Sequence, residues 1–439
     1  MSSQPSLNHW WMPFTANSEF RRAQRPRLIG AASGTHYVAD DGRELIDGMC
    51  GLMCSPCGHS RPEIARAVAQ QLEHMSYVPA FQVGHRLGFE LSERLVAMAP
   101  AGLTQVFYGN SGSEAVETAL KIALAYHRKR GEAQRTRLVG RERGYHGVNF
   151  GGMSVGGILA NRDAFGQGLP GVVHLSHTWH PQHRFSDGQP KTMGREMADE
   201  LEAICRKIGG HNIAACIVEP VAGSTGVLVP PVGYLERLRE ICNEHGILLI
   251  FDEVITGFGR LAAPFASQRF QVTPDLLVLA KGISNGAIPM GAVMVAERIY
   301  ETLSDQGQAS GIELFHGYTY SAHPAACAAA LATLDIFDRE CLIERAHGLE
   351  EQFQSAARSL RSLPVVTDVR GLGMMAGVDL EPLMESGKRG LATLQALYDA
   401  GVLVKFTADT MLIGPALVIE PNEITLLFER IGNVLADLA

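Results

Sequence analysis

Short apolar runs alternate with helix-length amphipathic stretches through the middle of the chain, from about residue 61 onward. The runs are almost wholly apolar and do not alternate with polar positions: Gln105–Tyr108, Ile213–Val218, Ile247–Phe251, Leu276–Ala280 and Ala292–Val295. Short unbroken apolar strands are typical of a parallel sheet that helices cover on both faces. The pattern therefore predicts a three-layer α/β domain with a mostly parallel central sheet.

The same pattern predicts several local elements. A helix is expected to begin at Ser111-Gly112-Ser113, because capping residues there precede apolar side chains at helical spacing, namely Val116, Ala119, Leu120, Ala123 and Leu124. Turn residues predict a hairpin at Asp40-Asp41-Gly42. A second hairpin is expected at Ala408-Asp409, between the strands Val402–Phe406 and Met411–Gly414.

Three parts of the chain differ in pattern. Residues 1–60 hold short apolar pieces broken by Gly and Asp, and we expect them to pack with a small domain. Residues 61–325 carry the alternating strands and helices and should form the large, cofactor-binding domain. Residues 326–439 change to helix followed by short strands and a final helix, which predicts a smaller α+β domain.

Composition narrows the class of protein. With 46% hydrophobic and 19% charged residues, the 439-residue chain resembles globular proteins, and its net charge of −8 favours neither nucleic acid nor an anionic membrane as partner. No apolar run approaches the roughly 20 residues that cross a bilayer. No basic region followed by an apolar stretch occurs in Met1–Trp11, so we expect a cytoplasmic protein. The eight cysteines should then remain reduced.

Three groups with chemical potential follow predicted strands. Ser111-Gly112-Ser113 offers free N–H groups at a helix start, Asp252 follows one buried run, and Lys281 follows another. Taken singly, a helix cap and an ordinary salt bridge explain them. In an open α/β sheet, however, ligands bind at the carboxyl ends of the strands, where these groups would meet.

Together the three groups match the needs of pyridoxal phosphate, which are a phosphate anchor, a partner for the ring nitrogen and an amine that forms a Schiff base. The helix start would bind the phosphate. Asp252 would keep the ring nitrogen protonated. Lys281, partly desolvated, would hold the cofactor and then move the proton between the substrate and cofactor carbons.

The chain also resembles a known family over nearly its whole length. It is similar to the class III aminotransferases, pyridoxal-phosphate transferases of fold type I, and most of all to ω-amino acid (β-alanine):pyruvate and amine:pyruvate aminotransferases. The matching stretches are Trp11-Met12-Pro13-Phe14, Asn110–Ala115, Arg143–Gly147, Val218-Glu219-Pro220, Phe251–Arg260, Ala280-Lys281, Asn285–Gly291 and His316–Ser321.

The resemblance implies roles for individual residues. Gly112 and Ser113 would hold the phosphate with help from Thr319 of a second subunit, so that a homodimer would be the smallest functional unit and a homotetramer stays open. Two further side chains would lie on the faces of the cofactor ring, and one carboxylate would support the hydrogen bonds around Asp252: these are Tyr145, Val254 and Glu219.

The resemblance also places a substrate pocket, lined by Leu52, Met53, Phe81, Tyr145, Ala222 and Lys405. Met53 stands where these relatives usually carry tryptophan, which implies a less flat donor pocket. Lys405 stands where they carry an arginine that grips the keto acid. Lysine supplies the charge but not the bidentate fork. The implied reaction is transfer of an amino group from an ω-amino acid or primary amine to pyruvate in two half-reactions.

Other readings of the sequence remain open at this point. A lyase, mutase or decarboxylase could use the same scaffold without a keto acid. A dinucleotide dehydrogenase is disfavoured because no G-x-G-x-x-G follows an early strand. Two spaced sets of side chains could in principle bind a metal. The first is interpreted as a pocket loop and consists of Cys50, Cys54 and Cys57 with His59. The second is interpreted as a solvated loop and consists of His174, His177, His180 and His183, so no metal is expected at either.

Overall fold

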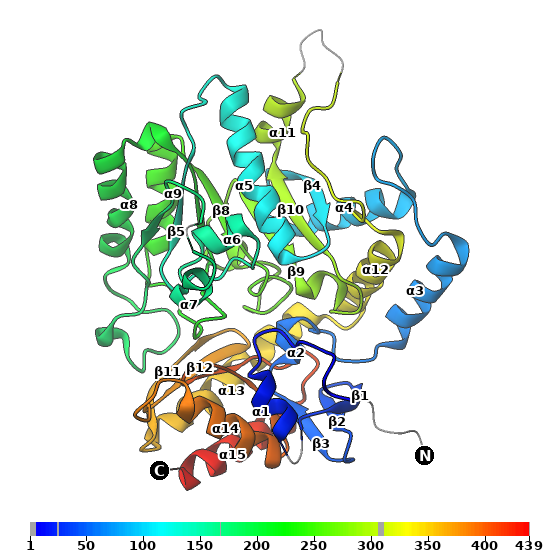
Figure 1. The fold of residues 1–439 in the computed structure, drawn as a ribbon, viewed down its shortest axis with the longest axis vertical. Coiled ribbons are helices and arrows are strands. Elements are labelled where there is room, and N and C mark those ends of the chain that lie inside the picture. Colours follow the sequence, from blue (N-terminus) through cyan, green and yellow to red (C-terminus); the bar gives the residue numbers. More distant parts are fainter. Residues whose placement is uncertain (1–5, 24–25, 167, 306–310, 439) are drawn as a thin grey trace.

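The computed structural model describes residues 6–23, 26–166, 168–305 and 311–438, and a seven-stranded sheet lies at the centre of its larger part (Figure 1). The strand order is β4-β10-β9-β8-β7-β5-β6. Only β10 runs against its neighbours, β4 and β9, while the other adjacent strands are parallel. The mostly parallel sheet expected from the apolar runs is therefore confirmed.

Five of the seven strands coincide with the predicted runs. β7 (Ile213–Val218) and β9 (Leu276–Ala280) have the expected bounds, and three others differ slightly: β4 (Leu103–Gly109), β8 (Leu248–Asp252) and β10 (Gly291–Ala296). Two strands were not expected, β5 (Arg137–Arg141) and β6 (Val173–Leu175). β5 has arginines at both ends and β6 is only three residues long, so neither forms a recognisable apolar run.

Helices cover both faces of this sheet. α5 (Gly112–Lys129) packs on the face that carries Ile217, Ile250 and Val278. α8 (Gly194–Ile208), α9 (Tyr234–His245) and α12 (Pro324–Arg339) belong to the core on the opposite face. Successive residues of a strand point to opposite faces, and every residue of the central strands β7, β8 and β9 is buried, so the predicted three layers are confirmed.

Two smaller sheets lie below this domain in Figure 1. One has the order β11-β12-β15-β14 and is antiparallel throughout, with β11 (Val366–Leu372), β12 (Met375–Leu380), β15 (Thr410–Ile413) and β14 (Lys405–Thr407). The other has the order β1-β2-β3-β13, so a strand from the end of the chain joins three from its beginning: β1 (Ile29–Ser33), β2 (His36–Ala39), β3 (Glu44–Asp47) and β13 (Val402–Leu403). The division at residues 60 and 325 stays a prediction.

The remaining helices complete the layers. Those of the smaller part are α13 (Leu342–Ser359), α14 (Lys388–Asp399), α15 (Pro421–Asp437), α1 (Asn17–Arg22), α2 (Cys50–Met53) and the 3₁₀ turn η4 (Leu360–Ser362). The others are α3 (Pro62–His74), α4 (Arg86–Met98), α6 (Phe150–Val155), α7 (Leu159–Asp163), α10 (Ala266–Arg269), α11 (Glu297–Ser304) and the turns η1 (Pro181–His183), η2 (Gly210–Asn212) and η3 (Lys281–Ser284). None of the helices within the described ranges is long and apolar enough to span a membrane.

Both predicted hairpins are present, but one of their strands is not as expected. The turn at Asp40-Asp41-Gly42 joins β2 to β3, and Ala408-Asp409 joins β14 to β15. The single strand predicted over Val402–Phe406 is wrong, because the chain changes sheets at the buried Val404. β13 pairs with β3 and β14 pairs with β15. Lys405 therefore begins a new strand at the junction of two sheets.

The solvated loop expected for the spaced histidines is also wrong. His174 lies in β6, and its Nε2 is 3.1 Å from the Ser154 carbonyl oxygen and 3.0 Å from that of Gly156. His183 is buried in η1. Burial lowers the pKa of both imidazoles, which favours their neutral forms.

Candidate active site

The ends of three central strands meet at one edge of the sheet. β8 ends at Asp252, and β9 ends immediately before Lys281. The register pairs Gly291 of β10 with Ala280 on one side and with Gly109 at the end of β4 on the other. The start of α5, which follows β4, is thereby brought to the same edge as the aspartate and the lysine.

Asp252 is buried and oriented by two donors. Its Oδ1 accepts a hydrogen bond from the Val254 N–H at 3.1 Å, and its Oδ2 lies 2.9 Å from Nδ1 of His146. His146 is also buried, and its Nε2 has no hydrogen-bond partner among the described residues. The motif that contains Tyr145 includes this histidine, but nothing in the sequence pattern indicated its contact with Asp252.

Lys281 is half-buried, and burial lowers the pKa of its amine to about 8. A thiolate at the nearby Cys54 would oppose this shift, as do the carboxylates of Asp252 and Glu219. The Lys405 ammonium adds to it, since two like charges in one place disfavour each other. A lysine with this pKa has a substantial neutral fraction near pH 8 and is therefore a competent nucleophile.

Glu219 lies behind these groups as a buried carboxylate. Its Oε1 accepts a hydrogen bond from the Tyr145 N–H at 2.9 Å, and its Oε2 accepts one from the Gly223 N–H at 3.0 Å. Burial disfavours the charged form of both side chains, so it raises the pKa of Glu219 and lowers the pKa of Lys405. Glu219 nevertheless favours the charged form of Lys405.

The neighbouring acid, Glu253, has a structural role. Its carboxylate accepts hydrogen bonds from the backbone N–H groups of Ala266 and Ser267 at the start of α10 and from the Thr256 hydroxyl. Burial raises its pKa to about 7, and these donors oppose that shift. Of the two adjacent acids at the end of β8, Asp252 is the one that faces the site.

The start of α5 has the shape of an anion cradle. Ser111 caps the helix, and its Oγ accepts a hydrogen bond from the Glu114 N–H at 3.2 Å. The N–H groups of Gly112 and Ser113 have no partner within the helix, as at any helix start. A Cβ at Gly112 would lie 3.1 Å from the side chain of Val254, so the glycine allows close packing against this valine, two residues after Asp252. These residues fit a phosphate group beside Asp252 and Lys281.

Two predicted site residues, Phe81 and Thr319, lie together on an exposed surface of the subunit. The ring of Phe81 packs so closely on Gly317 that a Cβ there would be 2.9 Å away. The hydroxyl of Tyr77 donates a hydrogen bond to the Thr319 carbonyl at 2.9 Å. Phe81 is 57% exposed and Thr319 is also exposed. We call Tyr77, Phe81, Gly317 and Thr319 the outer patch.

The other predicted pocket residues differ in exposure. Leu52 is 56% exposed, whereas Met53 and Ala222 are buried. The methyl group of Met53 packs toward Gly414, where a Cβ would be only 2.5 Å from it. Met53 therefore fills the space next to the end of β15, and the adjacent Leu52 faces outward.

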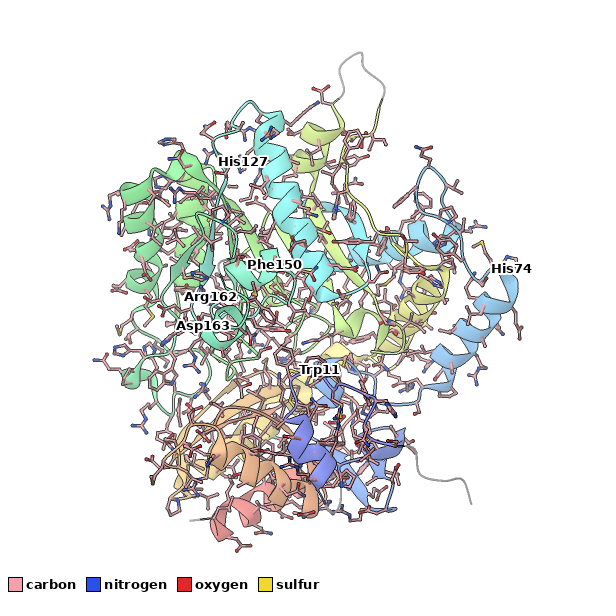
Figure 2. All side chains as sticks on the ribbon, in the orientation of Figure 1. Trp11, His74, His127, Phe150, Arg162 and Asp163 are labelled. Carbon is pink, nitrogen blue, oxygen red and sulfur yellow. The ribbon has the colours of Figure 1, made fainter. Side chains whose placement is uncertain are left out.

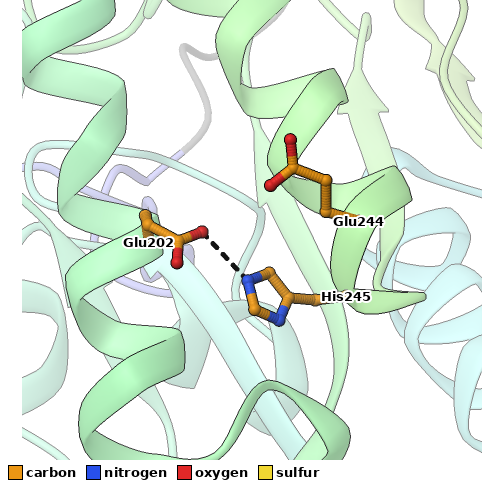
Figure 3. A group of neighbouring side chains, drawn as sticks. All are labelled: Glu202, Glu244 and His245. Carbon is orange, nitrogen blue, oxygen red and sulfur yellow. Dashed lines mark hydrogen bonds and ion pairs between the residues drawn. The ribbon is translucent and has the colours of Figure 1, made fainter.

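One group of possible metal ligands exists in the described part of the chain, and it lies away from this site. Glu202, Glu244 and His245 place their ligand atoms within 4.8 Å of one another between α8 and α9 (Figure 3). Nε2 of His245 already lies 2.9 Å from the Glu202 carboxylate, which makes an ordinary ion pair when the imidazole is charged. The eight cysteines are all free thiols.

Comparison with known proteins identifies the family. The model of the class III aminotransferases matches residues 20–435. The chain belongs to this family. It is 52% identical over 434 residues to an omega-aminotransferase of Caulobacter vibrioides, with 98% of each chain covered. It is 45% identical to an omega-amino acid–pyruvate aminotransferase of Pseudomonas putida, covering 100% of this chain and 98% of that one.

A solved structure agrees with the fold and with the cofactor. The omega transaminase of Pseudomonas jessenii in complex with PMP superimposes with a TM-score of 0.93 at 32% identity, covering 99% of this chain and 98% of that one. The predicted fold type I architecture, the aminotransferase class and pyridoxal phosphate as cofactor are thus confirmed. The alternative of a lyase, mutase or decarboxylase gains no support.

Proposed function

We propose that this aminotransferase moves an amino group from an ω-amino acid or a primary amine to pyruvate, in two half-reactions. Its similarity to omega-amino acid–pyruvate and beta-alanine–pyruvate aminotransferases supports this choice of substrates. The structural observation that carries the chemistry is the half-buried Lys281, whose pKa is lowered to about 8 at the same sheet edge as the buried Asp252.

The residues around this edge divide the work. Ser111, Gly112 and Ser113 would bind the phosphate through backbone N–H groups and hydroxyls. Asp252, oriented by His146 and Val254, would hold a proton on the ring nitrogen. Pyridoxal phosphate supplies an electron sink for the carbanion of the substrate. Tyr145 and Val254 would lie on the two faces of its ring, and Glu219 would hold the backbone at Tyr145 and Gly223.

Lys281 would have two tasks. Its neutral amine would attach the cofactor, and after displacement by the substrate amine it would carry the proton that leaves the substrate carbon. The environment suits both tasks, because burial disfavours the ammonium form while Asp252 and Glu219 limit the shift.

Lys405 would recognise the carboxylate of the acceptor. Its ammonium group is half-buried and donates no hydrogen bond to any of the described residues, although Glu219 is near enough to favour its charge. A cation held in this way has capacity for a substrate carboxylate. Leu52, Met53, Phe81 and Ala222 would complete the pocket around the remainder of the substrate.

We also infer a homodimer in which each site uses the outer patch of the partner. Phe81 and Thr319 share that exposed patch, and the apolar side chain of Phe315 near it is 88% exposed. Further apolar side chains are exposed, including Trp11 and Phe150, both labelled in Figure 2. Large exposed aromatic groups favour burial between subunits.

The eight free cysteines support a cytoplasmic location.

Absorbance spectra of the purified protein test the proposal. A single amine donor should convert the bound cofactor to its amine form and release the carbonyl product, and pyruvate added afterwards should restore the first spectrum. Turnover of the amine with no need for a keto acid would contradict an aminotransferase half-reaction. Recovery with another keto acid, but not with pyruvate, would refute only the acceptor.

A further inference from the structure

The side chain of Asn285 is buried, and the backbone of this residue helps to close the turn that carries Lys281. Only 6% of Asn285 is exposed. It follows η3 with a left-handed φ of 52°, and its N–H donates to the Gly282 carbonyl at 3.2 Å. Gly286 N–H then donates to the carbonyl of Lys281 at 3.3 Å. Lys281 itself has a φ of 51°, which costs energy for a residue with a Cβ and needs neighbours to maintain it.

Both ends of the Asn285 amide bind a distant part of the chain. Its Oδ1 accepts a hydrogen bond from the Cys57 N–H at 2.8 Å, and its Nδ2 donates one to the Gly58 carbonyl at 2.9 Å. One partner is a donor and the other an acceptor, so only one orientation of the amide satisfies both. The two partners belong to residues 48–58, which we call the pocket loop because it contains Leu52 and Met53.

The pocket loop contains residues with unfavourable backbone dihedral angles, which need contacts with neighbouring residues to maintain them. Three successive or nearly successive residues have left-handed φ values, Cys50 at 51°, Gly51 at 71° and Met53 at 58°. Its beginning is fixed by Asp47, which accepts hydrogen bonds from the Met49 N–H at 2.9 Å and the Gly51 N–H at 2.6 Å. Asn285 fixes its other end, so the loop is held from both sides.

The turn and the loop are also in direct contact. A Cβ at Gly286 would be 3.2 Å from the Cβ of Cys54 and 3.2 Å from the hydroxyl of Ser55. Cys54 in turn lies close enough to Lys281 for the two side chains to interact electrostatically. A movement of the pocket loop would therefore change the distance between Leu52 and the lysine.

We propose that Asn285 is a positioning residue that holds the pocket loop at a set distance from Lys281 and thereby determines how well bulky amine donors are used. The proposal rests on the function proposed above, since it takes Lys281 as the cofactor lysine and Leu52 as pocket wall. A small amine fills little of the space next to the loop, so displacement of the loop affects it little. A large amine contacts the loop and loses that contact.

The test compares two neutral donors that differ in size, isopropylamine and 1-phenylethylamine, in Asn285→Gly. Glycine keeps the left-handed backbone at no steric cost and removes both side-chain hydrogen bonds. The specificity constant for 1-phenylethylamine should fall about tenfold relative to that for isopropylamine, mainly through KM, which corresponds to about 1.4 kcal/mol of lost contact between the larger amine and the displaced loop. Gln271→Gly is the matched control, because Gln271 is an exposed residue with a φ of 55° that precedes β9.

A second variant and a cycle exclude a purely structural role. Asn285→Asp keeps the acceptor for Cys57 N–H, loses the donor to Gly58, and should shift the ratio in the same direction. Leu52→Ala should lower the same ratio in the native background and have a smaller effect beside Asn285→Gly. An unchanged ratio in either stable, cofactor-loaded Asn285 variant overturns the proposal. Borohydride reduction and peptide mapping of the unaltered enzyme test Lys281 separately, so the two failures are distinguishable.

Discussion

Nδ1 of His146 lies 2.9 Å from Oδ2 of Asp252, and both side chains are buried. The other oxygen of the carboxylate accepts a hydrogen bond from the Val254 N–H. A buried carboxylate with a hydrogen-bond partner on each oxygen is held in one direction. Asp252 thus points in a fixed direction at the sheet edge that also holds Lys281.

His146 provides the first prediction, because its two ring nitrogens can be mimicked separately. His146→Asn places a donor near the position of Nδ1 and should retain most of the activity. His146→Gln places its amide near the position of Nε2, leaves Asp252 without that donor, and should slow the amine half-reaction by about 10- to 100-fold, equivalent to ~1.4–2.7 kcal/mol. Single-turnover absorbance measures both variants. Equal rates for the two variants would show that the contact does not act through Asp252.

Removal of the Asp252 charge gives the second prediction. Asp252→Asn should still bind the cofactor phosphate through Gly112 and Ser113, yet slow proton abstraction by orders of magnitude, because the ring nitrogen loses its anionic partner. Cofactor content and half-reaction rate are measured on the same sample. Near-native rates would show that another group protonates the ring nitrogen.

The third prediction follows from the pKa of Lys281. Burial lowers this pKa from 10.5 to about 8, so the neutral, nucleophilic amine is roughly one tenth of the total at pH 7 and most of it by pH 9. Capture of pyridoxal phosphate by the cofactor-free enzyme should therefore accelerate about tenfold between pH 6 and 7 and level off above about pH 8. Stopped-flow absorbance follows the reaction. A rate that continues to rise to pH 10 would indicate an ordinary, solvated lysine.

A variant checks that this lysine is the reacting one. Lys281→Ala should lose turnover and the visible absorbance that borohydride abolishes in the native enzyme. Lys405→Ala is the control, since it removes the second lysine of the site. If Lys281→Ala retains cofactor that borohydride fixes to another lysine, the assignment is wrong.

The sequence anticipated the elements whose cause is local. β7 and β9 have the bounds of their apolar runs, because strands that are buried on both faces need apolar side chains at every position. The start of α5 was recognisable from its cap and spacing. The break at Val404 was not, because the run Val402–Phe406 is apolar enough for one strand and divides only through pairing with two different sheets.

The candidate site shows the same distinction. Asp252 and Lys281 stood out because each directly follows an apolar run. His146 and Asn285 did not stand out, since their partners are 106 and 228 residues away in the chain. The resemblance grouped Phe81 with Lys405 in one pocket, and this grouping stays a prediction; within the subunit, Phe81 lies beside Gly317 in the outer patch. Only the folded chain shows which distant residues meet.

The outer patch supplies the fourth prediction. Lys281→Ala and Thr319→Ala should each be inactive or strongly impaired as homodimers. Mixed dimers should regain activity, because one site would combine the native Lys281 of one subunit with the native Thr319 of the other. Tagged subunits show whether exchange has occurred. Absence of recovered activity after verified exchange would place Thr319 outside the partner's site.

Lys405 gives the last prediction, because it is a partly buried cation without a hydrogen-bond acceptor among the described residues. Burial of its ammonium group lowers its pKa. A charge-assisted hydrogen bond to a substrate carboxylate contributes about 1.5–3 kcal/mol. Lys405→Met keeps much of the apolar length of the side chain and removes that bond. The apparent dissociation constants of pyruvate and alanine should therefore rise by about tenfold or more.

Two comparisons make this prediction specific. The half-reaction with 1-phenylethylamine should be almost unchanged in Lys405→Met, because this amine has no carboxylate to lose. Lys405→Arg restores the charge as a bidentate fork and should bind pyruvate at least as tightly as the native enzyme. If alanine and 1-phenylethylamine weaken equally in Lys405→Met, the lysine supports the pocket without binding the carboxylate. If neither changes, the acceptor is held elsewhere, and pyruvate itself comes into question.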